Sequence, residues 1–210
     1  MEKQVDILIV GAGISGIGLA VHLSKHCPQR SFDIIERRES IGGTWDLFKY
    51  PGIRSDSDMS TFGFNFKPWQ KESVLADGAS IKGYLSEVVE EFKLQPKIHF
   101  QHRVLSANYD SATCKWSVEI LDAQGKKQIW IANFVLGCTG YYNYDQGFQP
   151  EFPNQQAFKG EFIHPQHWPE NLNYKGKKVV IIGSGTTAIT LVPAMAKGGA
   201  GHVTMLQRSP

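Results

Sequence analysis

The stretch VDILIVGAGISG, Val5–Gly16, decides the fold that the sequence predicts. Its first half is apolar and mostly β-branched apart from one acid, which is typical of a parallel strand covered on both faces. Its second half carries the pattern GxGxxG, and a helical stretch then runs through His26. A second short strand, Ser31–Glu36, completes a β-α-β unit of the usual length. The sequence therefore predicts an α/β fold with a doubly wound, Rossmann-like domain.

The glycines of this motif suit a dinucleotide. They permit a tight turn, a close approach of the backbone to a pyrophosphate and close packing of helix on strand. The helix N-terminus adds N–H groups and a partial positive charge. Glu36 lies 20 positions after Gly16, where a carboxylate accepts hydrogen bonds from an adenosine ribose and repels a 2′-phosphate. The alternative is a glycine-rich turn with a structural role only.

The same unit recurs near the end of the sequence. A strand at Lys178–Ile182 precedes GSGTTA at Gly183–Ala188, a helix to about Ala196 and a strand at Val203–Arg208. The chain thus contains an internal repeat, and the repeat predicts the start of a second Rossmann-like domain.

The two units differ at one position. Gly11 and Gly183 are 172 positions apart, and so are Glu36 and Arg208. Because an arginine pairs with a 2′-phosphate, the second unit is predicted to bind NADPH and the first a different nucleotide. A chain that binds both is most simply a flavin enzyme with FAD in the first unit. The alternative for Arg208 is a solvated charge at a strand end.

Composition narrows the class of protein. The 210 residues are 41% hydrophobic and 20% charged, enough for a full-sized core, and the net charge of +2 argues against nucleic-acid binding. The uncharged run Ile7–Val21 is interrupted by glycines and lacks the flanks of a signal peptide or membrane span. No transmembrane segment is expected, and the histidines form no convincing set of metal ligands, so no metal is expected.

Cysteine usage points to a reducing compartment. Cys27, Cys114 and Cys138 are an odd number without CxxC spacing, which fits a cytoplasmic location. It also argues against a disulfide reductase, which needs a dithiol beside its flavin. Dioxygen is then the expected electron acceptor.

The middle of the chain alternates between irregular and regular stretches. Residues 37–79 hold no regular pattern, and an irregular segment of that length is usually functional. The stretch Ser80–Phe92 has the apolar stripe of a helix. Strands are expected at Arg103–Tyr109, Lys115–Leu121 and Gln128–Leu136, with a hairpin turn at Asp122–Lys126.

Two segments carry a resemblance to a known family. The segment GGTWDLFKYPGIRSDSD, Gly42–Asp58, looks like the flavin-proximal signature of the class I Baeyer–Villiger monooxygenases. The segment FKGEFIHPQHWP, Phe158–Pro169, resembles that family's fingerprint FxGxxxHxxxWP at every fixed position. The related N- and S-oxygenating flavin monooxygenases usually lack the Trp168–Pro169 ending. In detail, the chain is similar to a mycobacterial member of the family that activates a thioamide prodrug, and the similarity covers essentially all 210 residues.

The resemblance implies FAD and NADPH as cofactors and assigns residues to each. Residues expected at the FAD are Gly11, Gly13, Ser15, Gly16, Glu36, Thr44, Trp45, Asp46, Asp56 and Val104. Residues expected at the NADPH are Gly183, Ser184, Gly185, Thr186, Thr187, Ala188, Ile189, Arg208 and Ser209.

One residue has an implied catalytic role. Asp56 corresponds to an aspartate beside the flavin that positions a catalytic arginine, which is expected beyond Pro210. By itself, the surrounding SDSD is also a plausible turn or helix cap. His164 is expected to hydrogen-bond backbone and set domain orientation, without a catalytic role.

The resemblance implies insertion of one oxygen of O₂ next to a ketone carbonyl through a C4a-peroxyflavin, which gives an ester or lactone. Sulfides or thioamides are expected as further substrates. Two alternatives stay open: a heteroatom monooxygenase without ketone activity, and a non-catalytic, truncated FAD-binding fragment. The expected domains are 1–142 for FAD, 143–175 as the linker with the fingerprint, and 176–210 as the truncated beginning of the NADPH-binding domain. The sequence does not indicate the oligomeric state.

Overall fold

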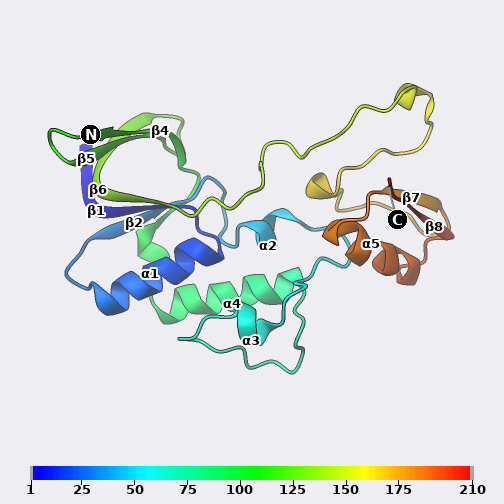
Figure 1. Cartoon of the computed structure of the whole chain (residues 1–210), viewed down its shortest axis with the longest axis horizontal. Helices are drawn as coiled ribbons and strands as arrows, with labels where there is room; N and C mark the ends of the chain where they lie inside the picture. Colours follow the sequence, from blue (N-terminus) through cyan, green and yellow to red (C-terminus); the bar gives the residue numbers. More distant parts are fainter. Residues whose placement is uncertain (1, 209–210) are drawn as a thin grey trace. The chain divides into compact units, whose positions relative to one another are not determined.

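The computed structural model describes residues 2–208, which form two compact units (Figure 1). The first unit contains the chain up to Asp46 together with Ile81–Tyr141. The second unit contains Leu47–Ser80 and the chain from Tyr142 onward. Residues 47–80, which fall inside the expected flavin domain, therefore group with the second β-α-β repeat.

The first unit is built on a six-stranded sheet in the order β3-β2-β1-β6-β5-β4. Its strands are β1 (Glu2–Val10), β2 (Phe32–Ile35), β3 (Ile98–His99), β4 (Arg103–Asp110), β5 (Lys115–Leu121) and β6 (Lys127–Gly137). Strand β1 pairs in parallel with both β2 and β6, and β4, β5 and β6 form an antiparallel meander. Gly125 turns the β5–β6 hairpin with φ 76°. The predicted parallel core strand and the hairpin are thereby confirmed.

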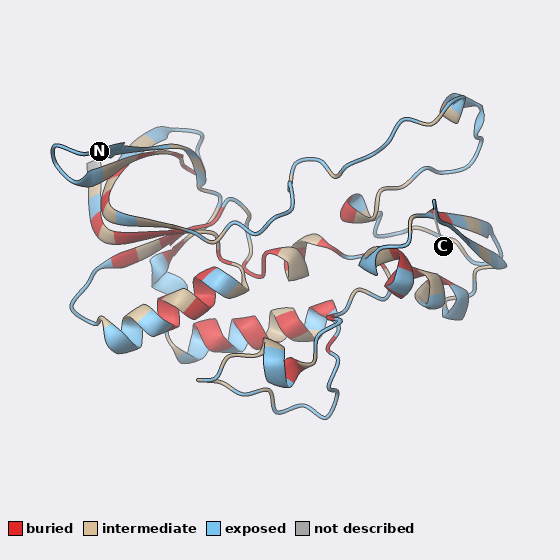
Figure 2. Ribbon diagram, viewed as in Figure 1, coloured by how far each residue is buried: buried red, intermediate tan, exposed pale blue. Residues whose placement is uncertain are grey.

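Two long helices, α1 (Ile14–His26) and α4 (Gly78–Glu91), lie on the same side of this sheet in Figure 1. The short helix η1 (Gln95–Lys97) leads from α4 into β3. Most of the predicted apolar stripe on α4 is buried, and the α4 ribbon carries several red segments in Figure 2. Its buried members are Ile81, Tyr84, Leu85, Val88 and Val89. Helix α4 thus covers the sheet with the face that its apolar periodicity predicts.

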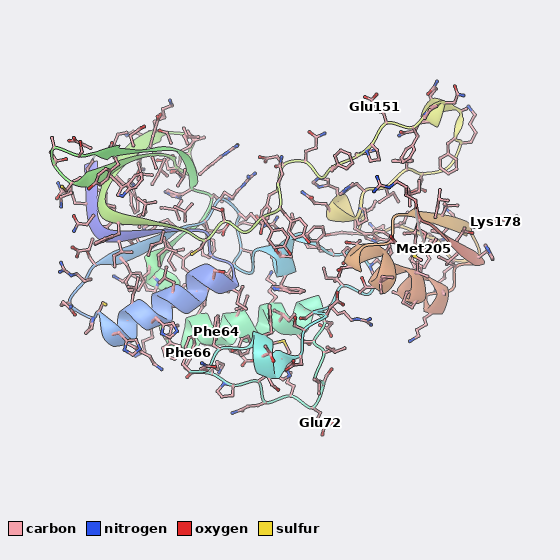
Figure 3. The ribbon with its side chains drawn as sticks, in the orientation of Figure 1. Phe64, Phe66, Glu72, Glu151, Lys178 and Met205 are labelled. Carbon is pink, nitrogen blue, oxygen red and sulfur yellow. The ribbon has the colours of Figure 1, made fainter. Side chains whose placement is uncertain are left out.

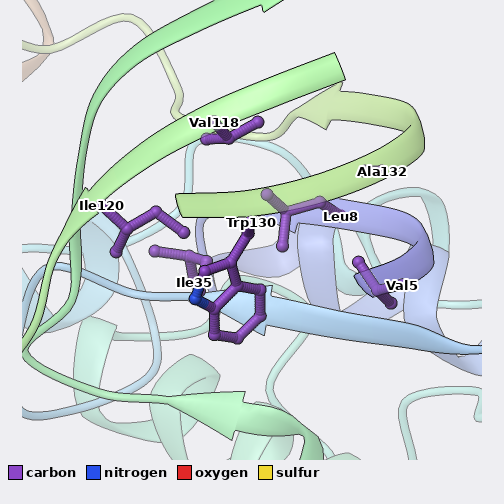
Figure 4. Close-up of a cluster of buried hydrophobic side chains, with 7 residues drawn as sticks. All are labelled: Val5, Leu8, Ile35, Val118, Ile120, Trp130 and Ala132. Atoms are coloured by element: carbon purple, nitrogen blue, oxygen red, sulfur yellow. The ribbon is translucent and has the colours of Figure 1, made fainter. Parts of the chain in front are cut away.

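A cluster of seven buried side chains fills the first unit where β1 meets the meander (Figure 4). Its members are Val5, Leu8, Ile35, Val118, Ile120, Trp130 and Ala132. Trp130 is the largest, at 2% exposure, and its indole Nε1 donates to the Gln128 side chain at 3.2 Å. This hydrogen bond satisfies the one polar atom that the indole brings into the core.

The second unit contains the repeat as β7 (Lys178–Ile182), α5 (Thr186–Lys197) and β8 (His202–Leu206). Strands β7 and β8 pair in parallel. The remaining helices are short: α2 (Thr44–Leu47), α3 (Met59–Phe62), η2 (Gln155–Ala157) and η3 (Pro165–His167), with α2 crossing the boundary between the units. The core consists of Phe48, Tyr50, Ile181, Ala188, Leu191 and Met195.

Gly52 explains why residues 47–80 belong to the second unit. Its φ is +85°, and a Cβ added there would lie 2.5 Å from the carbonyl oxygen of Thr190 and 2.7 Å from the Cβ of Ala194. Both of these residues are on α5, so only glycine allows the chain to lie this close to the helix. The buried Tyr50 hydroxyl lies 3.5 Å from Thr190 Oγ1 on the same helix.

The segment also contains stacked aromatic rings. Phe64 and Phe66, labelled in Figure 3, have ring centroids 4.7 Å apart and an interplanar angle of 16°.

Between residues 2 and 208, no helix has both the length and the apolar composition that crossing a bilayer requires.

Candidate functional site

The first glycine turn has a backbone that other residues cannot adopt. Gly11 has φ +110°, and a Cβ added there would overlap the carbonyl oxygen of Cys138 at the end of β6. Its N–H donates to the carbonyl oxygen of Ile35 at 2.8 Å, which ties the turn to the end of β2. A Cβ at Gly16 would overlap the carbonyl oxygen of Gly11, so this glycine lets α1 pack close to the turn.

The N-terminus of α1 is open to an anionic ligand. Gly13 is the N-cap, no side chain caps the helix, and the first turn carries no acidic residue. A helix start of this kind presents backbone N–H groups and the positive end of the helix dipole. Lys25 and His26 lie in the last turn, where they complement the negative end. The turn therefore fits a pyrophosphate.

Glu36 lies where the sequence predicts it, directly after β2. Its side chain is buried, and its carboxylate accepts hydrogen bonds from the backbone N–H groups of Ala12 at 2.8 Å and Arg38 at 2.9 Å. Ala12 belongs to the glycine turn, so the carboxylate is held at the edge of the turn. A carboxylate can accept about four hydrogen bonds, which leaves capacity for ribose hydroxyls.

The flavin-proximal signature meets the first turn through its two glycines. The N–H of Gly42 donates to the carbonyl oxygen of Ala12 at 3.0 Å. A Cβ added to Gly13 would lie 3.6 Å from the Cα of Gly43. The backbone alone thus forms a cradle between the two segments, and Thr44 and Trp45 follow it at the start of α2. Seven residues expected at the FAD therefore lie in this turn or directly follow a segment that contacts it. They are Gly11, Gly13, the exposed Ser15, Gly16, Glu36, Thr44 and Trp45.

Asp46 belongs to an ion cluster that the sequence does not reveal. Its buried carboxylate is 2.5 Å from Arg38 Nη2 and 2.5 Å from Lys82 Nζ on α4. Burial raises the pKa of the Asp46 carboxyl, but the hydrogen bonds from Lys82 and Arg38 lower it further, and the net pKa is below the usual value. Asp46 therefore holds the signature loop to two neighbouring segments. Sequence reasoning missed Lys82 because no local pattern marks it.

The second unit contains Asp56, and its surroundings differ from the expected helix cap. Asp58 caps α3 by accepting hydrogen bonds from the backbone N–H and the hydroxyl of Thr61, both at 2.9 Å. Asp56 lies exposed in the bend before it. The capping alternative for SDSD is thus met by Asp58, and the catalytic role of Asp56 stays a prediction.

Val104, another residue expected at the FAD, lies in β4 and in neither glycine turn. Val104 is partly buried in β4 and packs against the core cluster that contains Trp130. Next to it, between Val104 and Ser106, the pairing of β4 with β5 shifts register. Ser209 lies outside the described residues, so its predicted contact with NADPH stays a prediction.

The second glycine turn repeats the geometry of the first. Gly183 has φ +124°, and its N–H donates to the carbonyl oxygen of Leu206 at 2.8 Å. Gly185 is the N-cap of α5, again with no side-chain cap and no acid in the first turn. A Cβ added to either glycine would meet nothing within 4 Å. The residues expected at this site are Ser184, Thr186, Thr187 and Ile189 beside the turn and Ala188 buried against the core.

The register of the strands corrects the expected correspondence between Glu36 and Arg208. In the first unit Val10 pairs with Ile35, and in the second Ile182 pairs with Leu206. The residue that follows β8 in the place of Glu36 is therefore Gln207. Arg208 lies one position further, and the predicted strand to Arg208 ends at Leu206. The physical reason is that the path from the first motif glycine to the end of the neighbouring strand is one residue shorter in the second unit, from Gly183 to Leu206, than in the first, from Gly11 to Ile35.

The fingerprint residues have structural contacts within the second unit. His164 Nδ1 accepts a hydrogen bond from the backbone N–H of Gln166 at 3.2 Å, which confirms its expected bond to backbone. The buried Gln166 side chain donates to the carbonyl oxygen of Asn143 at 2.7 Å. Trp168 packs against the core next to β7 and α5. These contacts fix the path of the connecting segment.

Comparison with known sequences gives matches over the whole chain. A family described as flavin-binding monooxygenase-like matches residues 2–208. The "Probable FAD-binding monooxygenase AlmA" of Acinetobacter baylyi is 80% identical over 210 residues, which make up 100% of this chain and 42% of that protein. The "FAD-containing monooxygenase EthA" of Mycolicibacterium smegmatis is 56% identical over 210 residues, with the same two shares. The chain thus spans about two fifths of the length of the curated relatives it matches.

The fold is also similar to solved structures. Cyclohexanone monooxygenase from Rhodococcus sp. Phi1, bound to NADP⁺, matches with a TM-score of 0.83 and 30% identity. The match covers 100% of this chain and 39% of that one. The mixed α/β, Rossmann-like fold predicted from the first β-α-β unit is confirmed.

Proposed function

The chain belongs to the flavin-binding monooxygenase-like family, and we propose that the protein is an FAD- and NADPH-dependent monooxygenase of the Baeyer–Villiger class. The observation that carries this proposal is the pair of glycine turns. Each leads into a helix whose N-terminus has neither a side-chain cap nor an acid in its first turn. One chain thus offers two dinucleotide sites, and its relatives include proteins named for FAD and a structure bound to NADP⁺.

The first turn would hold FAD. The backbone N–H groups at the start of α1 bind the pyrophosphate, and Glu36 accepts hydrogen bonds from the adenosine ribose. The cradle of Gly13 and Gly43 lets the backbone approach the cofactor without side chains in the way. FAD bound there would take electrons from NADPH and pass them to dioxygen.

The second turn would hold NADPH. The start of α5 binds its pyrophosphate, and the open space at Gly183 and Gly185 leaves room for it. Arg208 lies two residues after the end of β8 and supplies a positive charge for a 2′-phosphate. Asp56 would position an arginine near the flavin.

We assign a ketone as the substrate class, with an ester or lactone as product, because the segment Phe158–Pro169 fits the Baeyer–Villiger fingerprint at every fixed position. Sulfides or thioamides would be further substrates. All three cysteines are free thiols, which supports the reducing cytoplasm as the location. The second candidate function is a heteroatom monooxygenase, which the Trp168–Pro169 ending disfavours.

Two measurements test the proposal. The purified 210-residue chain should be yellow and contain FAD, and a folded, colourless chain that ignores added FAD would refute the first site. For the full-length protein, a cyclic ketone and a sulfide should be compared as substrates with NADPH. Ester or lactone formation supports the Baeyer–Villiger class, whereas sulfide oxidation without any ketone conversion supports the heteroatom class.

A further inference from the structure

The two β-α-β units can be compared residue by residue through their hydrogen bonds. In each, the N–H of the first motif glycine donates at 2.8 Å to the last residue of the neighbouring strand, Ile35 or Leu206. The next residue is Glu36 in the first unit and Gln207 in the second. The residue after that is arginine in both units, Arg37 and Arg208. The arginine is therefore common to the two turns.

The residue directly after the strand lies at the glycine turn. In the first unit this residue is Glu36, and its carboxylate accepts a hydrogen bond from the N–H of Ala12, the residue after Gly11. A ribose bound beside the turn is within reach of that side chain. Gln207 occupies the same position after β8 and is exposed.

The difference between the two turns is thus one of charge and hydrogen-bonding type. An ionised glutamate only accepts hydrogen bonds and repels a phosphate. A glutamine is neutral, and its NH₂ group donates hydrogen bonds that a phosphate oxygen accepts. Since both turns have an arginine in the same place, the arginine cannot by itself be what distinguishes one nucleotide from the other.

We propose that Gln207 is the residue that admits a ribose carrying a 2′-phosphate to the second turn, and that Arg208 adds affinity once the phosphate is admitted. The ligand class is an adenosine nucleotide with a 2′-phosphate. This inference rests on the proposed NADPH site and names the residue that sets its specificity.

The experiment uses 2′,5′-ADP and 5′-AMP as probes, which differ only in the 2′-phosphate. Their dissociation constants are measured by calorimetry on the FAD-loaded, full-length protein. The wild type should bind 2′,5′-ADP at least tenfold more tightly than 5′-AMP. Gln207→Glu should reduce this ratio to about one or below, mainly by weakening 2′,5′-ADP. Gln207→Leu, which adds no charge, should keep an intermediate ratio.

Two further variants separate charge from position. Gln124→Glu makes the same change in the exposed β5–β6 turn and should keep the wild-type ratio. Arg208→Ala should weaken 2′,5′-ADP about 10- to 100-fold, as expected when a charged hydrogen-bonding partner is lost. The flavin absorbance of each variant shows whether the protein remains folded.

The outcomes distinguish this inference from the function on which it rests. A wild-type protein that binds both probes equally would overturn the 2′-phosphate site and the inference together. A wild-type preference that survives unchanged in Gln207→Glu but disappears in Arg208→Ala would overturn the role of Gln207 alone. Loss of preference in Gln207→Glu with its retention in Gln124→Glu supports the inference.

Discussion

Asp46 has an electrostatic role that its position in the flavin signature does not suggest. Its carboxylate is buried, and each oxygen already accepts a hydrogen bond from a cation, Arg38 on one side and Lys82 on the other. The expected direct contact with FAD therefore competes with these two partners. We regard Asp46 as a residue that positions the loop carrying Thr44 and Trp45.

The variant Asp46→Asn tests this role through pH. It keeps the shape of the side chain but removes the negative charge that Arg38 and Lys82 face, and we expect a loss of about 1–3 kcal/mol in the free energy of unfolding at pH 7. The pKa of Asp46 is lowered in the folded state. Its stabilisation is therefore present above the unfolded value of about 3.9 and is lost as pH falls through the folded value.

Urea unfolding of wild type and variant at pH 7 and near pH 3 checks this expectation. The difference in the free energy of unfolding between the two proteins should be smaller at the acidic pH. Glu151→Gln, at an exposed position, serves as a control and should change neither value appreciably. A gap that stays constant across this range would mean that the charge of Asp46 contributes nothing.

At the scale of elements, the contact of residues 50–52 with α5 depends on a single glycine. Gly52→Ala combines a positive φ with a collision against the backbone of α5, and we expect about 3 kcal/mol of destabilisation. Gly83→Ala is the matched control, because Gly83 lies inside α4 and an added Cβ there meets nothing within 4 Å. It should stabilise by about 0.5–1 kcal/mol through helix propensity. The melting temperatures of the two variants test both expectations. Shifts of the melting temperature in the same direction would contradict the contacts described at Gly52 and Gly83.

Much of the first unit could be predicted from local patterns. The glycine motif, the apolar run before it and the stripe on α4 each depend on residues close in sequence, and each is found as expected. Strand β3 could not be predicted, because it has only two residues and exists through its pairing with β2. Its partner strand β2 lies far away in the sequence, so no local pattern indicates the pairing.

The second unit was harder to predict for the same reason. The grouping of residues 47–80 with α5 depends on the tight approach at Gly52, which no periodicity reveals. The correspondence of Gln207 with Glu36 depends on strand register. An equal count from the glycines gives Arg208 instead, because the path from the glycine turn to the end of the next strand is one residue shorter in the second unit. Among the candidate site residues, the sequence found both glycine turns but not Lys82 or Gln207.

At the scale of the whole molecule, the sheets of the two units differ in how far their apolar side chains are shielded from water. The first has six strands, whereas the second has a two-stranded sheet that exposes Val180, Ile182 and Leu206 at 51–61%. Two strands alone are marginally stable in water. The first glycine turn is therefore the better supported of the two proposed nucleotide sites within these 210 residues.

The role expected of Asp56 leads to a prediction about activity. The 210-residue chain should retain FAD but form no ester from a ketone with NADPH and O₂, because the positioning role of Asp56 requires an arginine that the resemblance does not locate among these residues. Product analysis by gas chromatography, with the full-length protein as positive control, measures this. Ester formed by the 210-residue chain would show that these residues suffice for catalysis.

Cys138, whose backbone carbonyl lies against Gly11, has a half-buried thiol. Burial raises the pKa of the Cys138 thiol, so little of it is the reactive thiolate at neutral pH. Cys114 is exposed in the turn between β4 and β5 and is the more accessible target for an alkylating reagent or peroxide. Oxidative damage should therefore begin at Cys114, far along the chain from the glycine motif, and the half-buried Cys138 should be labelled more slowly.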